Sequence, residues 1–264
     1  MNQQYWTDKG ERSINARLHM GRMEQKYHEQ ISDSVKMSQI YSSTVNNDGY
    51  DTSYTTDVVS YTTDVVVEDM DTVSAIFAHG DSSVKTAVLN FASYKNPGGR
   101  FLDGSKAQEE CLCHESTLYN VLSKFPEYYE WNKKNMNYGL YKDRAIYCRD
   151  IIFERGDLVQ TVDVITCAAP NKRVAIDYCK VSEYDNHIAL NSRIKFIMDI
   201  AYAEHVDILI LGAFGCGVFR QSPTEVASIF AGLLPNYDSF SKVVFAVPKT
   251  VHSENYDAFK QQFI

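Results

Sequence analysis

Residues 90–119 read NFASYKNPGGRFLDGSKAQEECLCHESTLY and begin inside the short apolar run TAVLNF, which spans Thr86 to Phe91. A short apolar run that stops at a glycine turn predicts a buried strand. After the turn, Ser105 to Gln108 forms a capping-box pattern, which predicts a helix that runs to about Phe125 and is ended by Pro126. The stretch therefore predicts a strand, a glycine turn and a helix whose first turn carries two glutamates.

Strands and helices continue to alternate along the rest of the chain. Val206 to Leu211 is a second apolar run, and it leads straight into the glycine loop GAFGCGVF. Apolar runs, helical spacing and capping residues predict strands at 145–148, 151–153, 162–168 and 243–247, and helices from Asp71 and over 188–203, 223–234 and 255–263. Residues 126–140 are expected to form an irregular excursion. This alternation predicts an α/β domain whose mostly parallel sheet is covered on both faces.

The N-terminal part of the chain has a different character. Residues 1–40 are polar, with apolar residues such as Ile14 and Leu18 at helical spacing, which predicts a helical extension docked on the main domain. A loop rich in Ser, Thr, Asn, Asp and Gly follows, and then the segment SYTTDVV occurs twice, at 53–59 and 60–66. Two copies are too few for a repeat fold, so we interpret the duplication as lengthening a loop or an edge hairpin.

Composition and charge argue against several classes of protein. The net charge of −8 disfavours direct nucleic-acid binding through a basic surface, although backbone amides can bind a small phosphorylated ligand without lysine. No apolar run approaches the ~18 residues of a membrane span, and the first residues lack the apolar segment of a secretory signal. We therefore expect a cytoplasmic protein that does not bind membranes. Cys111, Cys113 and His114 lack the second ligand pair that a zinc site needs, so no metal is expected.

Both glycine loops follow strands, and ligands of open α/β sheets bind at the carboxyl ends of the strands. In the first loop, Gly98 and Gly99 supply positive φ angles and let the backbone approach a ligand, although an ordinary turn would use them equally well. In the second loop, three glycines within six residues build a nest of N–H groups that suits a diphosphate, the alternative being a tight turn between strand and helix. Neither a Walker A loop nor a dinucleotide fingerprint is present.

Glu109 and Glu110 are adjacent on the predicted helix, so their side chains point about 100° apart. They cannot flank one bond as the paired acids of an ordinary glycosidase do, but one could act on the scissile bond while the other holds a neighbouring hydroxyl. The helix start lowers their pKa values and burial in a pocket raises them, and a general acid needs burial to dominate. The alternative is that both glutamates simply complement the helix dipole.

The glycine turn, seven further residues and then Gln-Glu-Glu resemble the signature of poly(ADP-ribose) glycohydrolases, in particular the microbial type. The resemblance continues through ITCAAPN (165–171) and ILGAFGCGVFRQSPTEVA into VVFAV. It implies a three-layer α/β/α macrodomain with a mixed, mostly parallel sheet and an N-terminal helical extension. The implied division is an extension at 1–64 and a catalytic domain at 65–264, together forming one compact unit. The implied protein is a monomer without cofactor, and its partners are poly(ADP-ribose), ADP-ribose and ADP-ribosylated proteins.

The resemblance also implies residue roles. Glu110 would protonate the departing ribose oxygen, leaving an oxocarbenium-like C1″, and then deprotonate water, while Glu109 would hold a ribose hydroxyl. Asn96, Gly98 and Gly99 would hold the distal ribose, and residues 215–219 would cradle the diphosphate. The implied ligand-binding residues are Asn96, Gly98, Gly99, Gln108, Gly212, Ala213, Gly215, Cys216, Gly217, Val218 and Phe219.

Arg100 departs from the family pattern, which has a third glycine there. If the position requires positive φ, arginine costs about 1 kcal/mol or more in strain; otherwise its side chain can point outward or contact phosphate. Two alternatives to the glycohydrolase therefore stay open. One is a macrodomain that binds ADP-ribose without cleaving it, and the other is a hydrolase of mono-ADP-ribosyl groups or other ADP-ribose derivatives.

Overall fold

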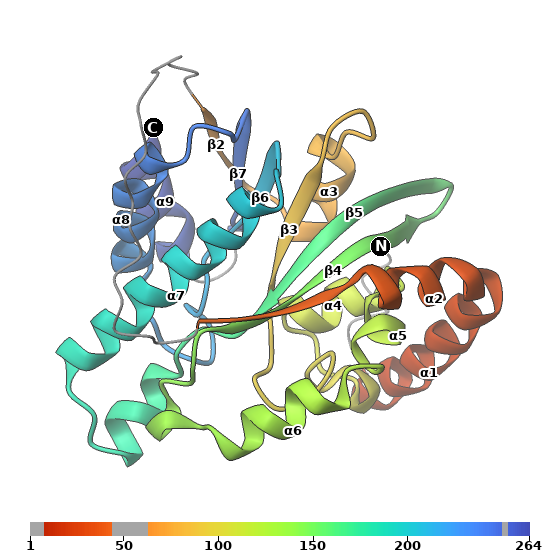
Figure 1. The fold of residues 1–264 in the computed structure, drawn as a ribbon, viewed down its shortest axis with the longest axis horizontal. Helices are drawn as coiled ribbons and strands as arrows, with labels where there is room; N and C mark the ends of the chain where they lie inside the picture. Colours follow the sequence, from red (N-terminus) through yellow and green to blue (C-terminus); the bar gives the residue numbers. More distant parts are fainter. Residues whose placement is uncertain (1–7, 44–62, 250–252) are drawn as a thin grey trace.

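The computed structural model describes residues 8–43, 63–249 and 253–264 (Figure 1). A seven-stranded sheet in the order β1-β4-β5-β3-β6-β7-β2 forms the centre of this part of the chain. Neighbouring strands from β5 to β2 are parallel, whereas β4 runs antiparallel to both β1 and β5. The predicted mixed, mostly parallel sheet is thus confirmed. The strands are β1 (Gln39–Ser42), β2 (Asp64–Glu68), β3 (Thr86–Phe91), β4 (Arg144–Arg155), β5 (Leu158–Cys167), β6 (Ile208–Leu211) and β7 (Lys242–Ala246).

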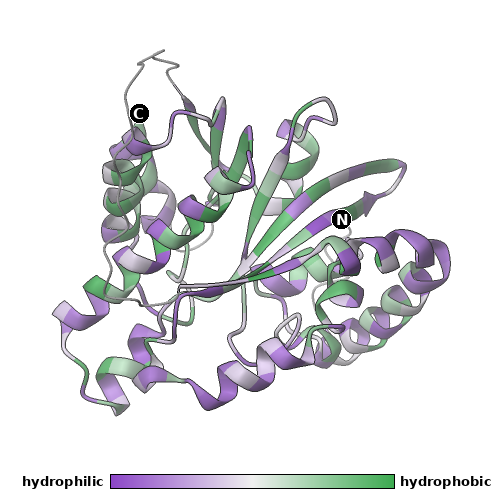
Figure 2. Ribbon diagram, viewed as in Figure 1, coloured by the Kyte–Doolittle hydropathy of each residue, from purple (hydrophilic) through white to green (hydrophobic). Residues whose placement is uncertain are grey.

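Helices cover both faces of the sheet, which confirms the three-layer architecture. One core lies between the sheet and the C-terminal helices, and a second lies between the opposite face and the helices from the first half of the chain. Figure 2 shows the contrast between hydrophobic central strands and the hydrophilic N-terminal helices. The helices are α1 (Lys9–Lys26), α2 (His28–Met37), α3 (Thr72–His79), α4 (Gln108–His114), α5 (Leu118–Leu122), α6 (Pro126–Lys134), α7 (Glu183–Ala203), α8 (Pro223–Leu233) and α9 (Glu254–Phe263), with short turns η2 (Phe101–Asp103), η3 (Asn137–Gly139), η4 (Val174–Tyr178) and η5 (Leu234–Asn236).

Two predictions about the segment after the glycine turn are wrong. The single helix to Phe125 is broken after α4, because the chain turns aside to pair Ser116 with Phe153 of β4 before α5 begins. The capping box is also not formed: Ala107 is the N-cap residue and makes no side-chain cap. In addition, the expected excursion after Pro126 begins with a regular helix, α6, which has that proline in its first turn.

The predicted N-terminal helical extension is confirmed as α1 and α2, but its inward face differs from the expectation. Ile14 and Leu18 are 62% and 66% exposed, whereas Arg12 and His19 are buried. The Arg12 guanidinium donates to the carbonyl of Gly104 at 2.7 Å. The inward face of α1 also carries the buried Ala16 and Met23, so it is part apolar and part polar, and its polar part binds backbone carbonyls of residues 102–104.

The extension also adds an edge strand, β1, to the sheet. Of the duplicated segment, the last residues of the second copy lie in β2, and the first copy falls outside the described residues.

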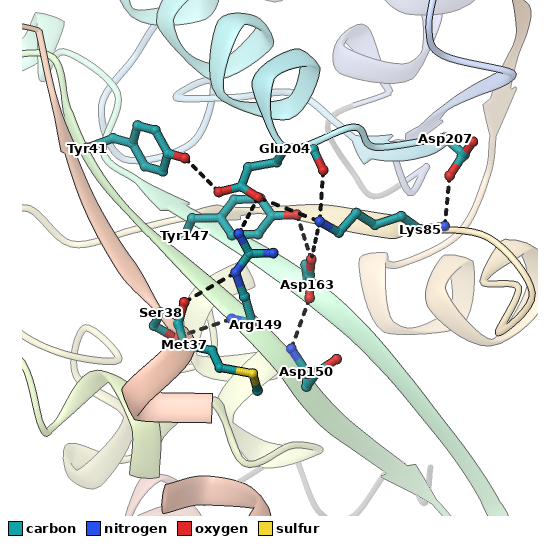
Figure 3. Close-up of polar contacts among 10 residues, drawn as sticks. All are labelled: Met37, Ser38, Tyr41, Lys85, Tyr147, Arg149, Asp150, Asp163, Glu204 and Asp207. Carbon is teal, nitrogen blue, oxygen red and sulfur yellow. Dashed lines mark hydrogen bonds and ion pairs between the residues drawn. The ribbon is translucent and has the colours of Figure 1, made fainter. Parts of the chain in front are cut away.

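A network of charged side chains ties β1 to the sheet (Figure 3). Tyr41 of β1 donates to Glu204 at 2.6 Å, and Arg149 of β4 contacts the same carboxylate at 2.5 Å. Lys85, just before β3, donates to the Glu204 carbonyl at 2.8 Å. No helix in the described residues is long and apolar enough to cross a membrane.

Candidate active site

The glycine turn after β3 brings the two glutamates together. Gly98 and Gly99 have φ angles of 62° and 63°, a conformation that favours glycine. A Cβ on Gly99 would lie 2.6 Å from Glu110 Oε1 and 2.9 Å from Glu109 Oε2. Both carboxylates therefore reach the same point of the turn even though they leave the helix in different directions. A side chain at position 99 would occupy the space that they share.

Glu109 is buried and fixed by hydrogen bonds. Its Oε2 accepts the backbone N–H of Ser93 at 2.7 Å, and its Oε1 accepts the side-chain amide of Asn90 at 3.3 Å. Burial, the largest effect, and the nearby Glu110 charge raise the pKa of Glu109 to about 8 against the opposing effect of the Ser93 hydrogen bond. At neutral pH the Glu109 carboxyl is therefore protonated. The burial effect that the sequence argument required of a general acid is found at Glu109.

Asn90 has a further feature that fits a protonated neighbour. Its amide nitrogen also donates to Thr166 at 3.3 Å, while its Oδ1 is buried and has no hydrogen-bond partner among the described residues. A half-turn of this amide would present Oδ1 to the proton of Glu109. Sequence analysis missed Asn90 because it lies within an apolar strand, where only its polarity sets it apart.

Glu110 is also buried, but one of its oxygens is left unused. Its Oε1 accepts the backbone N–H of Arg100 at 2.9 Å, and its Oε2 accepts no hydrogen bond from any residue that the structure describes. Glu110 can therefore offer Oε2 to a bound molecule, whereas Glu109 is held by protein donors. Arg100, which stands where the family has a third glycine, has φ −116°. It is not left-handed, so the arginine carries no strain of that kind.

Gln108, a predicted ligand contact, is engaged by the protein. Its Oε1 accepts the N–H of Phe91 at 2.9 Å, and its Nε2 donates to the carbonyl of Leu89 at 2.8 Å and to Thr72. These bonds attach the start of α4 to the end of β3. In this arrangement Gln108 positions the two glutamates that follow it.

The second glycine loop follows β6, the strand beside β3. Gly212 lies so close to β7 that a Cβ would sit 2.7 Å from the carbonyl of Ala246, and Gly215 has φ 76°. Phe214 is buried beneath the loop, 5.7 Å from the Phe91 ring. Ala213 and Cys216 are linked by a 3.2 Å backbone hydrogen bond. The loop is thereby fixed from below, with Val218 75% exposed at its tip.

The N–H groups of this loop are the feature that suits an anion. Those of Gly215, Gly217, Val218 and Phe219 donate to no residue in the described part of the chain. Consecutive backbone N–H groups at such a turn form a concave site for phosphate. The structure thus places the predicted diphosphate loop and the glutamates at the carboxyl ends of two adjacent strands, at the lower edge of the sheet in Figure 1.

Aromatic residues join the two loops, and sequence analysis missed two of them. Tyr94, between β3 and the glycine turn, stacks on Tyr141 with ring centroids 4.1 Å apart. Tyr141 in turn meets the edge of Phe219 at 6.1 Å. Tyr141 has φ 63°, and it directly follows the segment 126–140 that the sequence suggested was irregular. Their signal in the sequence was only a general abundance of aromatic residues.

Comparison with protein families matches residues 4–156, more than half of the chain, to the family described as microbial-type PARG, catalytic domain. Comparison with curated proteins gives no match. Among solved structures, poly(ADP-ribose) glycohydrolase from Thermomonospora curvata is 28% identical with a TM-score of 0.82, and the match covers 96% of this chain and 100% of that chain. The same enzyme bound to the inhibitor ADP-HPD gives a TM-score of 0.80.

A complex of the Deinococcus radiodurans glycohydrolase with ADP-ribose is 29% identical with a TM-score of 0.76, covering 88% of this chain and 96% of that chain. The family match includes the glycine turn, both glutamates and the N-terminal helices. The chain therefore belongs to the microbial-type poly(ADP-ribose) glycohydrolase family.

Proposed function

We propose that this glycohydrolase cleaves the ribose–ribose bond of poly(ADP-ribose) with Glu110 as general acid and base. Glu110 protonates the departing ribose oxygen as the bond to C1″ breaks, and its carboxylate then faces an oxocarbenium-like centre. A water molecule that loses its proton to Glu110 adds to C1″ and completes the release of ADP-ribose. The observation that carries this assignment is the unused Oε2 of Glu110 beside the glycine turn.

Glu109 is assigned a supporting role. Its raised pKa, caused first by burial, keeps Glu109 neutral, so it adds no second negative charge once Glu110 has given its proton to the departing ribose. As a neutral carboxyl it can also hydrogen-bond a ribose hydroxyl. Removing the like charge matters because two carboxylates that approach the same glycine would otherwise repel each other in a buried setting.

The remaining predicted contacts divide between the two loops. Asn96, whose side-chain amide has no partner among the described residues, and the backbone at Gly98 and Gly99 would hold the distal ribose. The free N–H groups of residues 215–219 would bind the diphosphate, with Phe219 against a ribose. ADP-ribose bound to the Deinococcus radiodurans enzyme supports a ligand of this class. We expect ADP-ribosylated proteins to be the polymer's carriers, and expect no metal or cofactor in the reaction.

The second candidate is a macrodomain that binds ADP-ribose without cleaving it. The reason for considering it was that Arg100 could distort the glycine turn. The unstrained backbone of Arg100 removes that reason. Hydrolysis of mono-ADP-ribosyl groups would use the same pocket, and comparing polymer with mono-modified protein separates it from the main proposal.

The test is Glu110→Ala, with ADP-ribose release from polymer and ADP-ribose affinity both measured. We expect release to be abolished while affinity stays micromolar, because the diphosphate loop is untouched. Glu127→Ala is the matched control, since it removes an exposed carboxylate from the first turn of α6. Full turnover by Glu110→Ala would refute the assignment, and binding without turnover by the wild type would favour the binding module.

A further inference from the structure

The Arg100 side chain extends outward beside Glu110. Its backbone N–H binds Glu110, but its guanidinium leaves the turn and pairs with Asp103 at 3.0 Å. Both side chains are exposed, Arg100 at 66% and Asp103 at 55%. The two residues line a cavity of about 310 Å³, whose other walls are Asn96, Pro97, Gly99, Leu102 and Tyr119. This cavity is separate from the diphosphate loop, because no residue of that loop lines it.

The position of Glu110 limits where the departing part of the substrate can lie. The departing ribose must come within hydrogen-bond distance of the Glu110 carboxyl to receive its proton. The backbone of Arg100 is itself 2.9 Å from that carboxyl, so the departing ribose sits next to Arg100. In poly(ADP-ribose) this ribose belongs to an adenosine whose 5′ carbon carries a diphosphate. A phosphate therefore follows one ribose beyond the bond that breaks, within reach of a long arginine side chain.

The chemistry of Arg100 suits that phosphate. A guanidinium binds phosphate oxygens through two parallel N–H bonds, which a lysine cannot reproduce. Its ion pair with Asp103 is exposed and joins residues three apart, and such pairs contribute only about 0–1 kcal/mol. The guanidinium can therefore exchange Asp103 for a phosphate at little cost.

We propose that Arg100 and the adjoining cavity form a subsite for the phosphate of the departing nucleotide, with Asp103 as the competing partner of the guanidinium. This inference rests on the proposed role of Glu110. The subsite favours substrates whose leaving group is a further ADP-ribose unit over substrates whose leaving group carries no phosphate. Asp103 weakens the subsite by occupying the guanidinium before substrate binds.

The experiment compares two substrates with the same ADP-ribose unit in the pocket. One is the dimer of two ADP-ribose units, and the other is ADP-ribose with an uncharged 4-methylumbelliferyl group at C1″. The quantity measured is the ratio of kcat/KM for the dimer to kcat/KM for the umbelliferyl substrate. We expect Arg100→Ala to lower this ratio about five- to tenfold at low salt. Asp103→Asn, which frees the guanidinium, should raise it about two- to fivefold.

Ionic strength and a matched lysine provide the controls. The effect of Arg100→Ala should shrink as salt rises, because the contact is exposed and screened. Lys106→Ala removes an exposed positive charge from the same loop without touching the cavity, and it should leave the ratio at the wild-type value. The subsite would be overturned if Arg100→Ala left the ratio unchanged, for example by an equal loss on both substrates. A lower ratio for Asp103→Asn than for the wild type would also overturn it. A wild type that releases no ADP-ribose from the dimer would instead refute the proposed function and the subsite with it.

Discussion

Replacing Glu109 with glutamine should change how the stability of the protein depends on pH. Burial raises the pKa of Glu109 from 4.5 to about 8 in the folded state. A raised folded-state pKa gives a stabilising contribution that is fully present below the unfolded value and is lost as pH rises through the folded value. For Glu109 this window runs from pH 4.5 to about pH 8.

The magnitude follows from the size of the shift. Each pKa unit corresponds to about 1.4 kcal/mol, so the shift sets an upper limit of roughly 5 kcal/mol, and a loss on the order of 3 kcal/mol across the window is a realistic expectation. Glutamine does not titrate, and its side-chain oxygen can still accept the Ser93 N–H. Between pH 5 and pH 8.5, the free energy of unfolding of Glu109→Gln should therefore fall by about 3 kcal/mol less than that of the wild type.

Urea unfolding at several pH values measures this difference directly. Titrating groups far from Glu109 contribute equally to both proteins, so the gap between the two stability curves reports on Glu109 and its immediate surroundings. Glu127→Gln, an exposed glutamate change on α6, should give a curve parallel to the wild type. Parallel curves for Glu109→Gln, or a variant that is relatively less stable at pH 8.5 than at pH 5, would refute a protonated Glu109.

Two further predictions concern the framework of the site. Gly99→Ala should reduce ADP-ribose release at least a hundredfold in a polymer assay, because its Cβ would lie 2.6 Å from Glu110 Oε1, and should cost about 1–2 kcal/mol through its φ of 63° in thermal unfolding. Arg12→Ala should lower the free energy of unfolding by about 1–3 kcal/mol in urea titration, because it leaves the buried Gly104 carbonyl without its donor. The control for Gly99→Ala is Gly156→Ala. Gly156 is also left-handed but has open space around it, so only the backbone cost is expected.

The strands could be predicted well because their signal is local. Thr86–Phe91 was found with its observed bounds, and most later elements differ from their predicted bounds by only a few residues. The strands predicted at 145–148 and 151–153 are instead two parts of β4, which is irregular between Cys148 and Ile151. The break between α4 and α5 could not be predicted, since it is caused by a bridge from Ser116 to Phe153 across a large sequence separation. Local capping patterns cannot report such a contact. Likewise Gln108 fits a capping box in the sequence, but β3 captures its side chain.

The candidate site was predictable as far as motifs define it. The two loops and both glutamates lie where the sequence suggested, at the ends of adjacent parallel strands. What could not be predicted is the environment of each carboxyl: the Ser93 N–H and the Asn90 amide reach Glu109 only once β3 and α4 have packed together. The same packing decides which glutamate is held by the protein and which retains a free oxygen.

The contacts of α1 with residues 101–104 have a consequence for how the enzyme can change. Ser13 donates to the carbonyl of Leu102 at 2.6 Å, and Arg12 binds the carbonyl of Gly104, both from about ninety residues earlier in the chain. The same short loop carries Asp103, the partner of Arg100. A substitution in α1 can therefore shift the position of Asp103 without altering any residue that touches substrate. Natural variation or directed evolution could adjust the preference for a leaving group through this helix while the glycine turn and the glutamates stay unchanged.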